Sequence, residues 1–314
     1  MKKTIAVLSA GLFAATLSTS ASAAWWWEDT YTETEHPIVL VHGLSGFDSI
    51  GGVLDYWYRI PYALERSGAK VYVASVTPFE NSFVRGQELS DFLDTIPESE
   101  VNLIGHSQGS PTSRIGAAMN SDKVVSVTSV NGVNKGSKVA DFVRGVLPEN
   151  SFGETTVSTA INAVGTVISS FSGSYGSEQD ALQSLETLST EGTTELNNAL
   201  GWAGVDRNGC NGTSENVTVN GKNMKFFSWS GDRTYTNAFD ITDPALFLTG
   251  LVFGFQQNDG LVDICSAKLG NVIGVRYQMN HLDAVNQVLG ARSVWTNPVS
   301  LYRTHANRLK NKGL

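Results

Sequence analysis

Short apolar runs alternate with helix-like segments over residues 37–130, and this alternation restricts the chain to few folds. The runs are rich in Val and Ile and end near glycine or polar residues, which is typical of strands buried on both faces of a sheet. Strands separated by helices predict an α/β fold with a mostly parallel sheet that is covered by helices on both sides. We expect strands at 37–43, 70–76, 101–104 and 123–130, less clear strands at 224–230 and 271–279, and helices at 54–67, 83–96 and 109–119.

The third expected strand leads directly into Gly105-His106-Ser107-Gln108-Gly109, and a helix is expected immediately afterwards. G-x-S-x-G between a strand and a helix is the nucleophile elbow of α/β-hydrolases, a tight turn that lifts the serine hydroxyl above the sheet. The bare motif is expected about 0.3 times by chance in a chain of this composition, so its specificity comes from the strand and helix around it. We predict that Ser107 is the nucleophile of an acyl-transfer reaction.

An oxyanion hole needs two backbone N–H donors close to this serine. The residue after the nucleophile supplies the first, which is Gln108 here, and the loop after an early strand supplies the second. The strand expected at 37–43 ends in His42-Gly43-Leu44, so the N–H of Leu44 is our candidate.

A serine nucleophile needs a base, and in α/β-hydrolases the chain order is serine, then acid, then histidine. Of the five histidines only His281 and His305 follow Ser107. His281 comes just after an expected strand, whereas His305 lies in the polar segment 302–312, which we expect to be a solvated terminal helix. We therefore predict His281 as the base.

The acid that orients this base must lie between Ser107 and His281. Asp259 is one candidate, because Asn258-Asp259-Gly260 is a turn signal that follows an apolar run. Aspartates in turns are common, so the residues alone leave other candidates open. These are Asp206, Asp232, Asp240, Asp243 and Asp263.

Residues 1–23 have the features of a secretory signal peptide: Lys2 and Lys3, an apolar stretch over 5–17, and the A-x-A sequence 21–23. We expect export through the periplasm and a single mature domain, 24–314. The stretch is too short to span a bilayer, and no later apolar run reaches about 18 residues, so no transmembrane segment is expected. The alternative is that this segment is retained as an N-terminal anchor.

The charge and the cysteines further restrict the class of protein. The net charge is −8, and removal of Lys2 and Lys3 makes it −8 − 2 = −10, which disfavours nucleic acid and anionic membranes as partners. Only two cysteines occur, Cys210 and Cys265, and an exported chain matures under oxidising conditions. One disulfide is the simple expectation, and two free buried thiols are the alternative.

Residues 150–223 are rich in Ser, Gly and Thr and interrupt the alternation of strands and helices. Within them, 157–171 carries an apolar stripe at helical spacing and no charged residue. Such a stripe is compatible with an ordinary core helix or with a mobile lid that has an apolar underside.

From Tyr31 to Leu314 the chain resembles the extracellular true lipases of Gram-negative bacteria, the Pseudomonas-type lipases with their Vibrio, Acinetobacter and Proteus relatives. Long matching segments carry the resemblance. They are PIVLVHGLSGFD (37–48), VNLIGHSQG (101–109), NDGLV (258–262), MNHLDAVNQV (279–288) and HANRLKN (305–311).

The resemblance implies roles for residues that the spacing left open. It implies that Asp259 is the triad acid and His281 the base, that Leu44 and Gln108 form the oxyanion hole, and that 150–180 is a lid. It also implies a Cys210–Cys265 disulfide. Tryptophans 25–27 match nothing in the family pattern.

The family also holds one structural calcium ion. In this chain its ligands would be the carboxylates of Asp240 and Asp283 and the backbone carbonyls of Gln287 and Ala291. Ca²⁺ takes oxygen ligands, and a cation on Asp283 would hold the loop of His281. The alternative from the residues alone is that Asp283 caps a helix after His281.

These observations predict a secreted triacylglycerol lipase that acts on esters of long-chain fatty acids at an oil–water interface. A secreted carboxylesterase on short-chain soluble esters is the alternative. The resemblance further implies a lipase-specific foldase in the periplasm as a partner.

Overall fold

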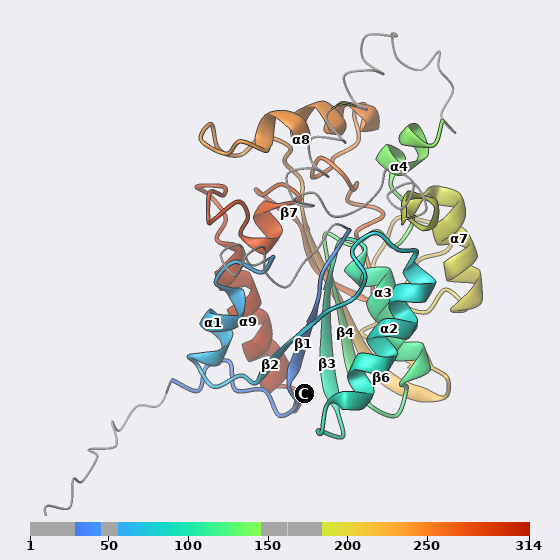
Figure 1. Cartoon of the computed structure of the whole chain (residues 1–314), viewed down its shortest axis with the longest axis vertical. Coiled ribbons are helices and arrows are strands. Elements are labelled where there is room, and N and C mark those ends of the chain that lie inside the picture. The colour runs from blue at the N-terminus through green and yellow to red at the C-terminus, as the bar shows by residue number, and fades with distance from the viewer. Residues whose placement is uncertain (1–28, 45–55, 146–161, 163–183) are drawn as a thin grey trace, which may run out of the picture.

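The computed structural model describes residues 29–44, 56–145, 162 and 184–314 (Figure 1). The expected signal peptide, tryptophans 25–27 and, apart from Asn162, the expected lid lie outside the described residues. The elements are β1 Ile38–Val41, α1 Ile60–Glu65, β2 Val71–Ala74, α2 Ser82–Thr95, β3 Val101–His106, α3 Gly109–Met119, β4 Val124–Val130, α4 Lys138–Val143, α7 Thr190–Ala199, β5 Asn216–Val219, β6 Lys222–Gly231, α8 Asp243–Gly250, the 3₁₀ helix η2 Leu251–Phe253, β7 Asn271–Tyr277, the 3₁₀ helix η3 Asp283–Val285 and α9 Pro298–Lys310.

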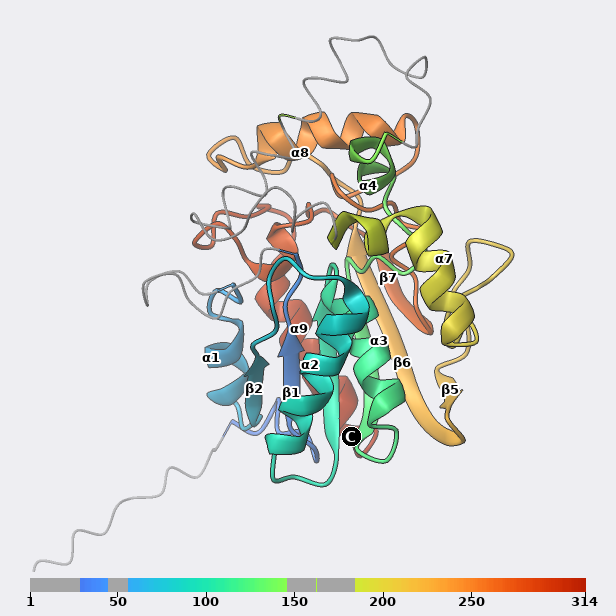
Figure 2. The same cartoon turned by 45° about the vertical axis from the view of Figure 1, so that its right-hand side comes forward.

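The described strands form one seven-stranded sheet in the order β2-β1-β3-β4-β6-β5, with β7 also paired to β6. All pairings are parallel except that of β5 with β6. In Figure 2 the sheet runs from β2 at one edge to β5 at the other, and α8 lies beyond its upper end. The predicted α/β fold, with its mostly parallel central sheet, is confirmed.

Alternate residues of the central strands pack into two cores on opposite faces of the sheet. In β1, Val39 and Val41 belong to the core under α2 and α3, whereas Ile38 and Leu40 belong to the core under α1 and α9. Figure 1 shows these two helix pairs on either side of the strands. Because both faces of the sheet are covered here, all four residues of β1 are buried and apolar, which is why this strand appears in the sequence as a continuous apolar run.

Strand β5 and helix α7 were not predicted, since they lie in the segment that was treated as an interruption. The signal for β5 was present, because Asn220-Gly221 joins it to β6 in a two-residue hairpin with φ values of 47° and 80°. Asn-Gly is the preferred pair for such a turn, since both positions need positive φ.

The expectation that residues 302–312 form a solvated helix is only partly right. A helix is present, but Tyr302, His305, Ala306 and Leu309 are buried. They recur at i, i+3, i+4 and i+7, which is the spacing of one helix face against a core. His305 packs against the rings of Phe227 and Trp229, and its Nε2 is 2.8 Å from Thr128 Oγ1.

No helix among the described residues is long and apolar enough to cross a bilayer.

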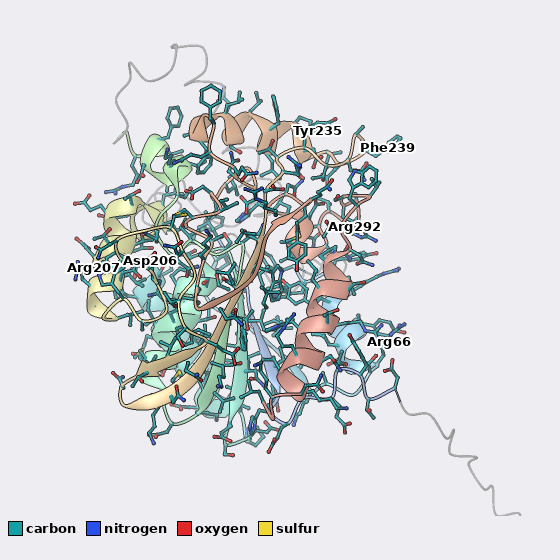
Figure 3. All side chains as sticks on the ribbon, turned by 180° about the vertical axis from the view of Figure 1, so that it is seen from behind. Arg66, Asp206, Arg207, Tyr235, Phe239 and Arg292 are labelled. Atoms are coloured by element: carbon teal, nitrogen blue, oxygen red, sulfur yellow. A yellow bond between two sulfur atoms is a disulfide. The ribbon has the colours of Figure 1, made fainter. Side chains whose placement is uncertain are left out.

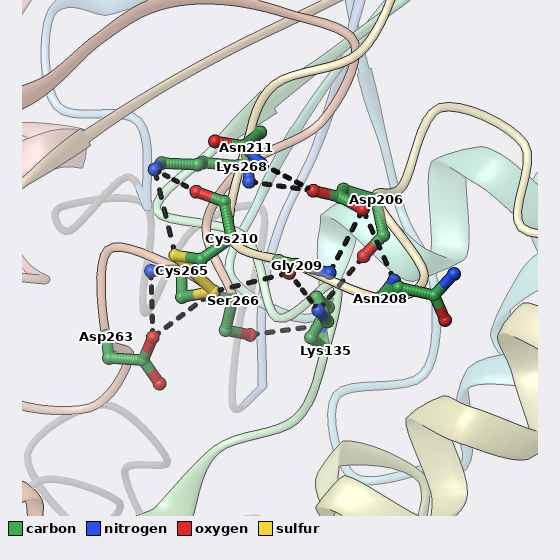
Figure 4. The surroundings of a disulfide bond; sticks show 10 residues. All are labelled: Lys135, Asp206, Asn208, Gly209, Cys210, Asn211, Asp263, Cys265, Ser266 and Lys268. Carbon is green, nitrogen blue, oxygen red and sulfur yellow. Dashed lines mark hydrogen bonds between the residues drawn. A yellow bond between two sulfur atoms is a disulfide. The ribbon is translucent and has the colours of Figure 1, made fainter.

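Cys210 and Cys265 form a disulfide, as predicted, with their Cα atoms 5.1 Å apart (Figure 4). Lys268 Nζ donates to the Cys210 carbonyl at 2.6 Å, and Asp263 Oδ1 accepts the backbone N–H of Cys265 at 2.8 Å. The disulfide therefore joins the exposed loop at 206–211 to the segment that follows Asp259.

Replacement of both cysteines by serine should lower the free energy of unfolding. The bond closes a loop with a sequence separation of 55 residues. The chain-entropy model then predicts a loss of about 4 kcal/mol. Urea unfolding of wild type and of Cys210→Ser/Cys265→Ser measures the difference. A reducing agent should move the wild-type midpoint and leave that of the variant in place, and equal midpoints in the oxidised proteins would contradict the prediction.

Candidate active site

Ser107 occupies a tight turn between β3 and α3. Its φ is 56°, in the left-handed region that side-chain-bearing residues seldom adopt, and its N–H donates to Val130 O at 3.0 Å. A Cβ on Gly105 would lie 2.1 Å from Gly109 O, and a Cβ on Gly109 would lie 2.0 Å from Val41 O. Neither contact is tolerable, so the turn requires glycine on both sides of the serine, and the buried Ser107 is held at the carboxyl end of β3.

The loop after β1 passes directly beside this serine. A Cβ on Gly43 would lie 2.7 Å from Ser107 Cβ, so glycine is needed for the approach. Leu44 comes next along this loop, and Gln108 begins the turn into α3. The structure thus brings both predicted oxyanion residues to the elbow from separate strands.

Arg85 of α2 ties these two segments together. Its guanidinium donates to the carbonyls of His42 and Gly43 and, at 2.9 Å, to Gln108 Oε1. Arg85 is fully buried, and burial lowers its pKa to about 10, so it stays charged at neutral pH. Among the described residues it has no carboxylate within salt-bridge distance, and carbonyl dipoles stabilise the charge instead.

Arg85 was not among the residues predicted from the sequence. A signal was available, because it stands four residues before Leu89 on the apolar face of its helix. An arginine at such a position must be paired or hydrogen-bonded.

His281 and Asp259 form a buried pair. His281 Nδ1 lies 2.9 Å from Asp259 Oδ2, and the backbone N–H of His281 donates to the carbonyl of Asp259 at 2.9 Å. The other carboxylate oxygen accepts the N–H groups of Leu261 and Val262 at 2.9 and 2.7 Å. The turn at 259–262 therefore orients the carboxylate of Asp259, and this carboxylate in turn orients the imidazole of His281.

The other candidate acids lie in different surroundings. Asp206 and Asp263 accept backbone N–H groups of their own loops, and Asp232 lies beside Arg233 and Gln257. Asp243 accepts from Asn280 Nδ2 at 2.6 Å. Asp240 accepts from Thr242. Of the six candidate acids, Asp259 is therefore the one that pairs with His281.

His106, the last residue of β3 and the neighbour of Ser107 in the chain, packs against His281. The rings of His106 and His281 have centroids 4.7 Å apart, and His106 Nε2 is 2.9 Å from the carbonyl oxygen of His281. No hydrogen bond joins the Ser107 hydroxyl to the His281 imidazole in the described part of the chain. Hydrogen bonds between catalytic groups often form only when substrate is bound.

One of the predicted calcium ligands, Asp283, lies close to His281. Asp283 follows His281 by two residues and is buried, and its carboxylate accepts the N–H groups of Asn280 and Ser293. Burial raises its pKa to about 7 and also raises that of Asp240. Asp240 Oδ1 accepts from Thr242, but Oδ2 is buried without a partner among the described residues.

The alternative role for Asp283, as a helix cap, does not hold. The segment after His281 is only the 3₁₀ helix η3, and Asp283 lies inside it. Its N-cap residue is Leu282, and the N–H groups of Leu282 and Asp283 donate to Asn280 Oδ1 at 2.9 and 2.8 Å.

Within the described ranges, no three His, Cys, Asp or Glu side chains form a metal-binding group. The predicted calcium site is not a group of this type, because it has only two carboxylates, and its other ligands are the backbone carbonyls of Gln287 and Ala291.

Comparison with known proteins agrees with this geometry. The family model described as the alpha/beta hydrolase fold matches residues 36–269. Triacylglycerol lipases of Vibrio cholerae and Burkholderia plantarii are 44% and 39% identical, over 100% and 96% of this chain and 100% and 93% of theirs. In fold the chain is similar to mature Bacillus licheniformis lipase BlEst2, with a TM-score of 0.61 and 17% sequence identity. The comparison covers 88% of this chain and 92% of the Bacillus chain.

A serine on a nucleophile elbow beside a histidine–aspartate pair defines a serine ester hydrolase of the α/β-hydrolase fold. The sequence identity and the coverage of the matches then identify the family. The chain belongs to the same family as these bacterial lipases.

Proposed function

We propose that this chain is a secreted triacylglycerol lipase that cleaves long-chain fatty acid esters through Ser107, His281 and Asp259. The observation that carries the proposal is the buried His281–Asp259 pair next to the elbow serine. The names of the Vibrio and Burkholderia relatives support the substrate class. Export through the periplasm, assistance by a foldase and a lid at 150–180 are parts of the same proposal.

The proposed reaction has two steps. His281 takes the proton of the Ser107 hydroxyl through Nε2 while the oxygen attacks the ester carbonyl, since Nδ1 is engaged by Asp259. The N–H groups of Leu44 and Gln108 bind the oxyanion. The imidazolium then gives its proton to the leaving alcohol, and water, activated by the same histidine, releases the fatty acid.

An apolar surface near the site supports a lipid substrate over a soluble one. Phe239 and Ile241, in the loop before α8, are 91% and 79% exposed, and Phe247, Leu251 and Phe255 are also exposed. Figure 3 shows Phe239 and Tyr235 pointing outward at this end of the molecule. α8 lies beyond the end of the sheet that carries Ser107 (Figure 2). Exposed apolar groups gathered in this way mark a binding surface.

A calcium ion held by Asp240, Asp283 and the carbonyls of Gln287 and Ala291 is the second part of the proposal. The buried, unpartnered Asp240 Oδ2 and the buried Asp283 carboxylate suit a hard cation, because buried carboxylates need compensation. When bound, the ion would supply positive charge that holds the loop of His281. The chemistry itself is left to Ser107, His281 and Asp259.

Ser107→Ala should abolish hydrolysis of a p-nitrophenyl ester, lowering kcat by about 10⁵-fold or more, because no other nucleophile is placed at the elbow.

Asp259→Asn should lower kcat by about 10⁴-fold, because the amide favours the wrong tautomer of His281. Steady-state kinetics measures both effects, with Ser300→Ala and Asp122→Asn as exposed controls. Labelling of wild type by a fluorophosphonate at any residue other than Ser107 would reject the assignment.

Phe239→Ser/Ile241→Ser should lower the rate on emulsified long-chain triglyceride by about tenfold, since less apolar area would enter the oil surface. The kcat/KM for a soluble short-chain ester should stay unchanged. Tyr62→Ser, an exposed aromatic on α1, is the matched control. Equal losses on both substrates, or a wild type that prefers soluble short esters, would favour the carboxylesterase alternative.

Removal of calcium with a chelator should lower Tm by roughly 5–10 °C, as expected for a ligand held at about 100 times its Kd. Asp240→Asn should lack this calcium-dependent increment, whereas Asp122→Asn, at an exposed site, should keep it. Differential scanning calorimetry measures the shift. A wild-type Tm that is the same with chelator and with calcium would refute the site.

A further inference from the structure

A continuous chain of hydrogen bonds runs beneath the elbow and joins the oxyanion loop to the loop of the base. The Gly43 N–H donates to Tyr56 Oη at 3.0 Å, Tyr56 Oη lies 2.6 Å from His106 Nδ1, and His106 Nε2 lies 2.9 Å from His281 O. Tyr56 and His106 are both buried. Their polar atoms therefore interact here with the protein and not with bulk water.

The direction of each bond follows from the chemistry of its partners. The His281 carbonyl can only accept, so His106 carries its proton on Nε2. Burial lowers the pKa of His106 well below its ordinary value, so the ring is neutral and Nδ1 is an acceptor. Tyr56 then donates to Nδ1, and its oxygen accepts from Gly43. Each donor in the chain thus meets an acceptor.

Aromatic packing holds the two side chains in these positions. Trp57 packs edge-on against both rings, with centroid distances of 5.2 Å to Tyr56 and 6.2 Å to His106. The backbone carbonyl of Tyr56 also accepts from Gln287 Nε2 at 3.1 Å, six residues beyond His281. Tyr56 therefore contacts the region of the base through its backbone as well as through its hydroxyl.

We infer that Tyr56 and His106 are positioning residues for ester hydrolysis, an inference that rests on the proposed function. Through one buried chain they fix the backbone of His281 and the turn that presents the Leu44 N–H. Both groups must be correctly placed in the same transition state, and a displacement near 1 Å costs on the order of 10²-fold in rate. Neither residue takes part in bond making.

Two substitutions interrupt the chain at different points. Tyr56→Phe removes the hydroxyl and keeps the ring, and His106→Leu removes the donor to the His281 carbonyl. Each should lower kcat on a soluble p-nitrophenyl ester about 10- to 100-fold, with KM nearly unchanged, because a misplaced base or oxyanion donor slows the chemical step without weakening substrate binding. The double variant should be no slower than the slower single one, because the chain acts as a unit.

A conservative replacement and a matched control separate positioning from packing. His106→Gln retains an amide N–H that can reach the His281 carbonyl and should recover most of the kcat lost in His106→Leu. Tyr62→Phe removes an exposed hydroxyl on α1 and should behave as wild type. Thermal melting of every variant reports stability separately. Values of kcat within twofold of wild type, or equal rates for His106→Gln and His106→Leu, would overturn the inference.

The outcomes also distinguish this inference from the proposed function. If the wild type hydrolyses the ester and Ser107→Ala does not, the proposed function is supported, whatever the rate of Tyr56→Phe. If the wild type has no activity, both the proposed function and this inference are overturned. Should the variants fail to fold, ¹⁵N NMR of histidine-labelled wild type still decides. A neutral His106 with its proton on Nε2 between pH 5 and 8 supports the chain, and a proton on Nδ1 overturns it.

Discussion

Close contact between backbone segments at the elbow is the constraint on which the rest of the site depends. Gly109 packs against the carbonyl of Val41, Gly105 packs against Gly109, and Gly43 packs against Ser107. A single Cβ at any of these glycines would meet its neighbour at 2.0 to 2.7 Å. Because β1 and β3 approach so closely, the turn after one strand and the loop after the other reach the same point in space.

Buried polar groups then hold the side chains and loops in place around this point. Arg85 holds the segments of the two proposed oxyanion residues from the α2 side, while Tyr56 and His106 pack against Trp57. Hydrogen bonds are stronger in such a low-dielectric interior, and leaving any of these groups unpaired would be costly. Buried hydrogen bonds therefore hold the site in place as much as apolar packing does.

Much of the fold could be predicted from local patterns. The runs at 37–43 and 101–104 became β1 and β3, and the helix expected at 83–96 became α2, because these elements bury a continuous face against one sheet. His305 shows the limit of such reasoning. Its segment is polar in composition, but one face of α9 is buried, and composition averaged over a segment hides a face.

The sequence by itself determined the sheet, the elbow and the family resemblance, because alternation, glycine spacing and chain order are local or linear properties. Only the tertiary structure showed that Asp259, the acid that the resemblance had implied, contacts His281, that Arg85 and Tyr56 reach the site, and that Asp283 is not a cap. Such contacts join segments up to 231 residues apart, as between Tyr56 O and Gln287 Nε2. Periodicity within a segment carries no information about its distant partner, and only the packed chain brings the two together.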